Sequence, residues 1–162
     1  MKTERFIELV KSNQEPLRRF LITLCCGNRE EAEDIAQDAL VKAYLSSPSF
    51  EERYKFSTWL FKIAYNTYLD RGKRAGSNVY FSVIGKDGWI PESSVEEDSF
   101  RYQSLYQALD RISERERTAI LLHYIGGYSV KESAEIMNCS SGAVKLLLMR
   151  GRNKLKEKLD LE

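Results

Sequence analysis

Basic side chains gather near the C-terminal end of the chain, where they could bind the phosphates of a nucleic acid. Residues 140–158 carry six lysines and arginines against one acidic residue. Cations on one face of a helix can contact phosphates and base edges in a duplex groove. The residues from 128 to 139 predict a shorter helix and a tight turn before it. The segment therefore predicts a helix-turn-helix, and its alternative is a helical hairpin with a solvated basic face.

A second basic segment, residues 50–74, contains seven aromatic residues and six lysines and arginines. Aromatic rings can stack on unpaired bases while cations follow the backbone of a single strand. Trp59 and Phe61 are expected to pack in the core, because most aromatic residues at helical spacing do so. Tyr54 and Phe56, in a predicted loop, are the candidates for stacking. The amide of Asn66 could read the edge of an extruded base.

Residues 29–45 predict an amphipathic helix with one acidic side. Asn28 is its expected N-cap, with Glu31 as the reciprocal acid of a capping box. Such an acidic side is either a solvated surface or a docking surface for a basic protein partner.

Residue types that carry out catalysis are not grouped in any known arrangement. His123 is the sole histidine, and Cys25, Cys26 and Cys139 lack metal-binding spacing. The sequence has no phosphate-cradling glycine loop and no nucleophile elbow. We therefore predict that the protein is not an enzyme, needs no cofactor or metal, and keeps its cysteines reduced and mostly buried.

Helices are predicted to position all of these residues. The first runs through apolar residues from Phe6 to Leu24, with a kink expected at Pro16 and an end at Gly27. Further helices are predicted over 29–45 and 57–74. Residues 75–100 interrupt the pattern as either a small hairpin or an extended acidic connector.

A second group of helices is predicted after this connector. One helix spans about 99–111, and capping boxes begin the next two at Ser113 and Ser129. Ser140 or Ser141 caps the last helix. Its predicted packing face consists of Val144, Leu148, Gly151, Leu155 and Leu159.

The overall composition fits a soluble, two-module protein that works with a partner. The chain is 43% hydrophobic and 30% charged, with a net charge of +1. It has no apolar run of about 20 residues and no signal peptide at its start, so we expect a cytoplasmic protein. A nearly neutral chain is a poor DNA binder by itself, because phosphate neutralisation dominates affinity. Another component is therefore expected to supply much of the binding energy.

Three segments in order, EEAEDIAQDALVKAY, FSTWLFKIAYNTYLDRGKR and LDRISERERTAILLHYIGGYSVKESAEIMNCSSGAVKLLLMRGRNKLKEKL, resemble the extracytoplasmic-function (ECF) sigma factors of bacterial RNA polymerase. The resemblance implies an all-α fold with a core-binding and minus-ten domain over 1–74, a linker over 75–100, and a helix-turn-helix domain over 101–162. It also implies a promoter-specificity subunit that opens DNA. The expected partners are core polymerase, promoter DNA and an anti-sigma factor.

The resemblance also implies a role for individual residues. The residues that would bind core polymerase, at its β′ clamp helices and β flap, are Asp34, Gln37, Asp38, Ile120, Leu121 and Leu122. The residues that would contact the minus-ten element are Tyr54, Phe56, Ser57, Asn66, Lys73 and Arg74. The residues that would contact the minus-thirty-five element are Ser141, Lys145, Arg150, Arg152 and Lys154.

The sequence departs from the family pattern at two places. Leu146 and Leu147 stand where polar residues are usual, which weakens the prediction of direct base reading. Ser133 replaces a core aliphatic residue, and its hydroxyl is expected to bond a carbonyl four residues earlier. The alternative functions are a free-standing, dimeric helix-turn-helix regulator and an interaction protein whose basic helix binds an acidic partner.

Overall fold

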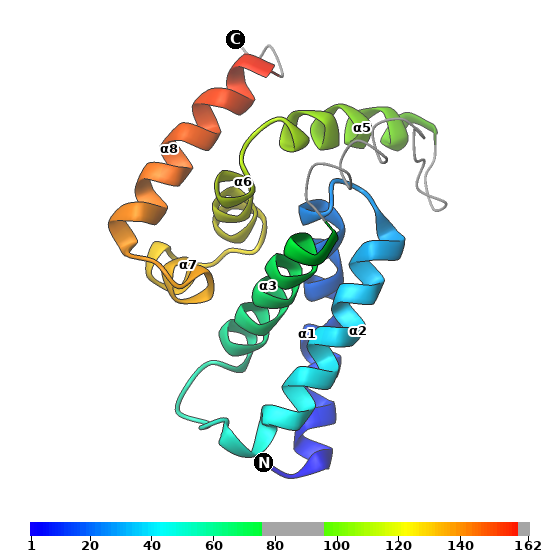
Figure 1. The fold of residues 1–162 in the computed structure, drawn as a ribbon, viewed down its shortest axis with the longest axis vertical. Helices are drawn as coiled ribbons and strands as arrows, with labels where there is room; N and C mark the ends of the chain where they lie inside the picture. The colour runs from blue at the N-terminus through cyan, green and yellow to red at the C-terminus, as the bar shows by residue number, and fades with distance from the viewer. Residues whose placement is uncertain (76–95, 159–162) are drawn as a thin grey trace.

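The computed structural model describes residues 1–75 and 96–158, and side chains over 1–72 and 103–158. Every regular element in these ranges is helical, so the predicted all-α fold is confirmed. Figure 1 shows two groups of helices side by side. The N-terminal module contains α1 (Thr3–Leu24), α2 (Arg29–Ser46), the short η1 (Ser47–Ser49) and α3 (Phe56–Ala75). The C-terminal module contains α5 (Glu96–Asp110), α6 (Glu114–Ile120), the π-helical η2 (Leu121–Ile125), α7 (Val130–Met137) and α8 (Ser141–Lys158).

The N-terminal module is built on an alanine-rich seam. Ala32, Ala36, Ala39 and Ala43 of α2 are almost completely buried, so α1 and α3 can approach α2 closely. Helix α1 includes Pro16 and continues to Leu24. Beyond it, Gly27 adopts a positive φ of 94° and donates its N–H to the carbonyl of Ile22. This left-handed turn satisfies the end of the helix, as the sequence predicts for Gly27.

Reciprocal caps define the helices of the C-terminal module. Ser113 with Glu116, and Ser129 with Glu132, form complete capping boxes at the starts of α6 and α7. Of the two serines predicted to cap α8, Ser140 does so, because its Oγ accepts a hydrogen bond from the N–H of Ala143. Helix α7 ends at Asn138 in the left-handed conformation. The α7–turn–α8 unit is therefore the predicted helix-turn-helix.

The packing face predicted for α8 is confirmed where the structure describes it. Val144, Leu148 and Gly151 are buried, and Leu155 is half-buried. A Cβ atom on Gly151 would lie only 3.0 Å from Cγ1 of Ile120, so glycine permits α8 to lie close to α6. Leu159 lies outside the described residues.

Three local predictions need correction or have no outcome. Helix α5 begins at Glu96, three residues before the predicted start, and its first residues are acidic, which the helix dipole favours. Ser133 is completely buried, but its Oγ makes no hydrogen bond within the described residues, so the predicted bond to a carbonyl is wrong. The hairpin or connector predicted from residue 75 onward lies mostly outside the described residues.

Within those residues, no helix is both long enough and apolar enough to span a lipid bilayer. Cys25 and Cys26 are buried and Cys139 is half-buried, and none of the three forms a disulfide bond. Burial raises the pKa of the Cys26 thiol to about 12, which keeps it protonated and unreactive.

Candidate protein and nucleic-acid interfaces

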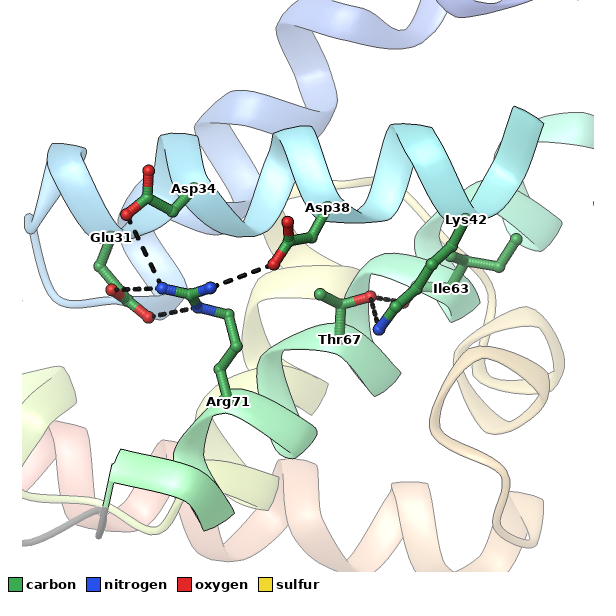
Figure 2. Close-up of polar contacts among 7 residues, drawn as sticks. All are labelled: Glu31, Asp34, Asp38, Lys42, Ile63, Thr67 and Arg71. Carbon is green, nitrogen blue, oxygen red and sulfur yellow. Dashed lines mark hydrogen bonds and ion pairs between the residues drawn. The ribbon is translucent and has the colours of Figure 1, made fainter. Parts of the chain in front are cut away.

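The acidic side of α2 is exposed and is organised by one arginine from α3. Asp34, Gln37 and Asp38 are exposed, whereas the alanines on the other side of the helix are buried. In Figure 2 the guanidinium of Arg71 lies among three carboxylates of α2. Its nitrogens lie 2.8 Å from Glu31 Oε1, 3.0 Å from Asp38 Oδ2 and 3.7 Å from Asp34 Oδ2. The face therefore keeps its predicted exposure but carries an internal counter-ion.

Asn28 caps α2 as predicted, because its side chain accepts a hydrogen bond from the N–H of Glu31. The carboxylate of Glu31 takes a different partner from the one predicted. Both of its oxygens accept hydrogen bonds from Arg71, at 2.8 and 3.2 Å. The position of Glu31 predicts a capping acid, but its carboxylate instead joins α2 to α3 through Arg71.

The candidates for contact with a single strand divide into exposed and buried residues. Tyr54 is 58% exposed and lies under the guanidinium of Arg53, at 4.9 Å from the ring centroid. Asn66 is exposed on α3, and Ser57 is half-buried in the first turn of that helix. Phe56 is only 6% exposed and packs edge-on against Phe50. Its ring is therefore a core group in this arrangement and is not available for stacking.

Trp59 and Phe61 pack in the core as predicted, with Phe61 almost completely buried. Lys73 and Arg74 lie in the last turn of α3, and their side chains are outside the described residues.

The basic side of α8 is exposed, and its cations fall into two groups. Ser141, Lys145 and Arg150 are exposed and have no hydrogen bond or ion pair to other described side chains. Arg152 donates a hydrogen bond to the hydroxyl of Tyr124 at 2.8 Å, and Lys154 lies 2.9 Å from Glu116 Oε1. The first group is therefore open to a ligand, and the second already has protein partners.

Glu116 needs its lysine because its carboxylate is only 4% exposed. Burial alone would raise the pKa of Glu116. Hydrogen bonds from Lys154 and Ser113 outweigh this effect and hold that pKa below its ordinary value. Leu146 and Met149 are 41% and 47% exposed on the same side of α8, and Leu147 is half-buried. The face thus combines cations with apolar side chains.

The apolar residues predicted to bind core polymerase on the helix after Ser113 are buried. Ile120, Leu121 and Leu122 are 7%, 2% and 0% exposed. Consecutive residues on a helix point in different directions, and here all three side chains are buried by other parts of the chain. Ile120 faces Gly151 of α8, and Leu121 lines a cavity with residues of α1. The exposed apolar residues at this end are Tyr124 and Ile125, which the sequence analysis did not select.

The two modules are packed against one another through Arg117, a contact that the sequence analysis missed. This residue is 1% exposed and donates hydrogen bonds to the carbonyls of Leu109 and Leu24 and to the hydroxyl of Tyr68. Leu24 and Tyr68 belong to the N-terminal module. Burial raises the pKa of the Tyr68 hydroxyl, so it stays protonated beside the cation. The sequence pattern that could have indicated this contact is the position of Arg117, which stands four residues before Leu121 and so lies on the same side of the helix.

Further contacts join α3 and its preceding loop to the helix-turn-helix. The rings of Phe61 and Tyr128 lie 5.2 Å apart, and Lys55 Nζ lies 3.1 Å from Glu132 Oε2. A cavity of about 580 Å³ separates the loop from α7, with Tyr54 and Lys131 on its two sides. The candidate residues of the two modules are therefore close together in this conformation.

Comparison with known proteins assigns both modules. Residues 9–77 match the family model "Sigma-70 region 2", and residues 102–155 match "Sigma-70, region 4". The chain is 36% identical to the ECF RNA polymerase sigma factor SigW of Bacillus subtilis over 146 residues, which are 82% of this chain and 78% of that protein. The chain belongs to the ECF RNA polymerase sigma factors.

Other relatives of this ECF sigma factor agree with the assignment. The ECF RNA polymerase sigma-E factor of Escherichia coli is 30% identical over 141 residues, covering 80% of this chain and 74% of that protein. The sigma factor RpoE of Bartonella quintana, solved in complex with the anti-sigma factor NepR, superposes with a TM-score of 0.83. It is 29% identical, and the match covers 99% of each chain. As a sigma factor, the protein directs transcription initiation and acts by binding rather than by catalysis.

Proposed function

We propose that this sigma factor docks on the β′ clamp helices of core polymerase through Asp34, Gln37 and Asp38. The observation that carries this proposal is their common exposure on the side of α2 opposite the buried alanines. Carboxylates held on a rigid helix attract a basic partner surface and fix its orientation. Ile120, Leu121 and Leu122 are buried here, so we assign contact with the β flap to Tyr124 and Ile125 instead.

The N-terminal module, residues 1–74, contacts the minus-ten element in this proposal. Tyr54 and Asn66 are exposed and stack on and read the unpaired bases. Ser57 lies in the first turn of α3, and Phe56 holds the preceding loop in place through its ring contacts with Phe6 and Phe50. Lys73 and Arg74 are assigned to the DNA backbone from their match to the family alone.

The C-terminal module, residues 101–162, binds the minus-thirty-five element through α8. Ser141, Lys145 and Arg150 are the direct contacts, because they are exposed and have no partner among the described side chains. Arg152 and Lys154 support the helix through Tyr124 and Glu116. Leu146 and Met149 offer apolar contact to thymine methyl groups.

Binding both elements requires the two modules to separate. The names of the elements place them about 25 base pairs apart, which is about 85 Å at roughly 3.4 Å per base pair. In the structure, Lys55 of one module and Glu132 of the other are 3.1 Å apart. Docking on polymerase therefore opens the molecule, and residues 75–100 link the two modules.

A closed molecule of this kind is also a suitable target for an inhibitor. The similar RpoE of Bartonella quintana is described in complex with the anti-sigma factor NepR. We assign an anti-sigma partner to this chain on that similarity, and a cytoplasmic site of action on the location of bacterial transcription.

Transcription in vitro tests the proposal. Purified protein, core polymerase from its own bacterium and fragmented genomic DNA are combined, and the 5′ ends of the transcripts are sequenced. The protein is expected to give transcripts with a shared upstream motif that core polymerase alone does not give. Tight, specific binding of a dimer to DNA without polymerase would support a free-standing regulator instead.

Two variants separate the two interfaces. Asp38→Arg is expected to abolish co-purification with polymerase while helix content stays unchanged. Arg150→Ala is expected to co-purify normally but to lower specific transcripts roughly tenfold. Glu15→Arg, a reversal at an exposed site of α1, is the control. Retained polymerase binding by Asp38→Arg would place the docking surface elsewhere.

A further inference from the structure

We infer that Arg71 is a positioning residue for polymerase docking, which holds the carboxylates of Asp34 and Asp38 in their binding geometry from the neighbouring helix. The inference rests on the function proposed above. It assigns a role in polymerase binding to a residue of α3, the helix proposed to read the minus-ten element.

The arrangement of donors suits this role. Arg71 places Nε and Nη2 on the two oxygens of Glu31, at 2.8 and 3.2 Å, as a two-pronged contact. Its Nη1 donates to Asp38 at 3.0 Å, and Nη2 lies 3.7 Å from Asp34. Figure 2 shows the guanidinium reaching from α3 to all three side chains. A planar group with five N–H donors can serve three carboxylates at once, which an ammonium group cannot do in the same geometry.

The three carboxylates need such a counter-ion. Glu31, Asp34 and Asp38 are separated by three and four residues, so they lie next to each other on α2, where like charges repel. Without Arg71, this repulsion would favour rotamers in which the carboxylates point away from one another. The hydrogen bond that Arg71 donates to Glu31, opposed by desolvation, raises the pKa of Arg71 above its ordinary value, so the counter-ion is permanently charged.

The cluster leaves binding capacity on the outside. The side chain of Glu31 is 20% exposed, and both of its oxygens accept hydrogen bonds from Arg71. Glu31 therefore fixes the position of Arg71. Asp34 and Asp38 are each 52% exposed, and Arg71 contacts only Oδ2 of each. Their Oδ1 atoms remain available to a basic partner. Arg71 thus orders the two aspartates without covering them.

A second polar contact on the same seam provides a comparison. Lys42 Nζ lies 3.4 Å from Thr67 Oγ1, one turn along each helix from the Asp38–Arg71 pair, as Figure 2 shows. This contact also joins α2 to α3 but touches neither aspartate. An effect confined to Arg71 therefore comes from the carboxylates and not from the α2–α3 seam in general.

Charge alone and positioning predict opposite results when Arg71 is neutralised. Arg71→Gln makes the docking face more negative, so simple attraction of a basic partner would tighten binding. Loss of positioning would weaken it, because binding must then order each freed side chain, at roughly two- to tenfold in affinity per side chain. The sign of the change therefore decides between the two.

The test measures association and dissociation rates of the full-length protein with its own core polymerase. Arg71→Gln is expected to weaken binding roughly two- to tenfold, mainly through faster dissociation. Arg71→Lys, which keeps the charge but loses the planar fork, should recover only part of this loss. Arg18→Gln is the matched control. Arg18, in α1, forms an ion pair with Glu33 of α2 at 3.0 Å and contacts neither Asp34 nor Asp38. Its affinity should be unchanged or tighter.

A double-mutant cycle identifies the residue through which Arg71 acts. If Arg71 works through Asp38, the loss in Arg71→Gln should largely disappear when Asp38→Asn is already present. Additive losses, or binding by Arg71→Gln as tight as the native protein at an unchanged melting temperature, would overturn the inference. Binding by Asp38→Arg at native affinity would instead overturn the proposed docking face, so the two failures are distinguishable.

Discussion

Ser133 shows how a single side chain can carry a cost that the sequence does not display. Its Oγ is buried in the C-terminal module and has no hydrogen bond within the described residues. In the same module Thr118 is equally buried, but its hydroxyl donates a hydrogen bond to the carbonyl of Glu114 at 2.7 Å. An unsatisfied buried hydroxyl costs about 1–3 kcal/mol, whereas a satisfied one does not.

Ser133→Ala is therefore expected to raise the free energy of unfolding by about 1 kcal/mol, because the cost of the buried hydroxyl is removed. Thr118→Val should lower it by a similar amount, because the carbonyl of Glu114 loses its donor. Urea unfolding of both variants measures the difference. A less stable Ser133→Ala protein would mean that this hydroxyl does find a partner in solution.

At the scale of elements, Glu132 belongs to two structures at once. Its Oε1 accepts a hydrogen bond from the N–H of Ser129 and completes the cap of α7, while Oε2 pairs with Lys55 of the N-terminal module. The backbone hydrogen bond from Ser129, aided by Lys55, holds the pKa of Glu132 below its ordinary value. A carboxyl group whose pKa is lowered by folding stabilises the folded protein at pH values above its ordinary pKa near 4.5. This stabilisation is lost as the pH falls through the lower pKa of the folded state.

Glu132→Gln should therefore flatten the fall in unfolding free energy as pH drops below the ordinary carboxyl value near 4.5, because this group no longer takes up a proton on unfolding. Urea unfolding at a series of pH values measures that slope. Glu135→Gln, an exposed position on the same helix, serves as the control. An unchanged slope in Glu132→Gln would contradict the contribution assigned to this carboxyl group.

Most elements could be predicted from the sequence because their signals are local. The serine–glutamate boxes of α6 and α7 and the packing face of α8 depend only on residues within one helix. Ile120, Leu121 and Leu122 could not be placed this way. Their burial depends on α8 on one side and α1 on the other, contacts that helical periodicity does not contain. The same holds for Glu31, whose partner lies 40 residues away.

At the scale of the molecule, the relation between the modules was beyond the sequence. Charge distribution predicted two nucleic-acid contacts on one chain but gave no sign that they lie against each other. Arg117 of the C-terminal module joins the two modules, because its buried guanidinium donates a hydrogen bond to the carbonyl of Leu24 at the end of α1. Separation of the modules must return this carbonyl and the Tyr68 hydroxyl to water or to another partner.

Separation can be followed with fluorophores attached to Glu51→Cys and Lys131→Cys, which lie on the two sides of one cavity. Energy transfer is expected to be high in the free protein and to be lost in the promoter complex, because the elements are about 85 Å apart. A pair at Lys131 and Glu157, both exposed in the C-terminal module, should not change. Undiminished transfer in a complex that makes transcripts would contradict the opening.

The ion pair between Lys154 and Glu116 has a consequence for how recognition responds to ionic strength. Lys154 already neutralises the buried carboxylate of Glu116, so we expect it to take little part in neutralising DNA phosphates, whereas Arg152 donates to a neutral hydroxyl and keeps its full charge. Each neutralised phosphate contributes roughly −0.9 to the dependence of log affinity on log salt concentration. If α8 binds DNA as proposed, removing Lys154 from its phosphate contacts makes the expected slope shallower by about 0.9. Binding of the proposed upstream element is therefore expected to depend less steeply on salt concentration than the number of cations on α8 suggests.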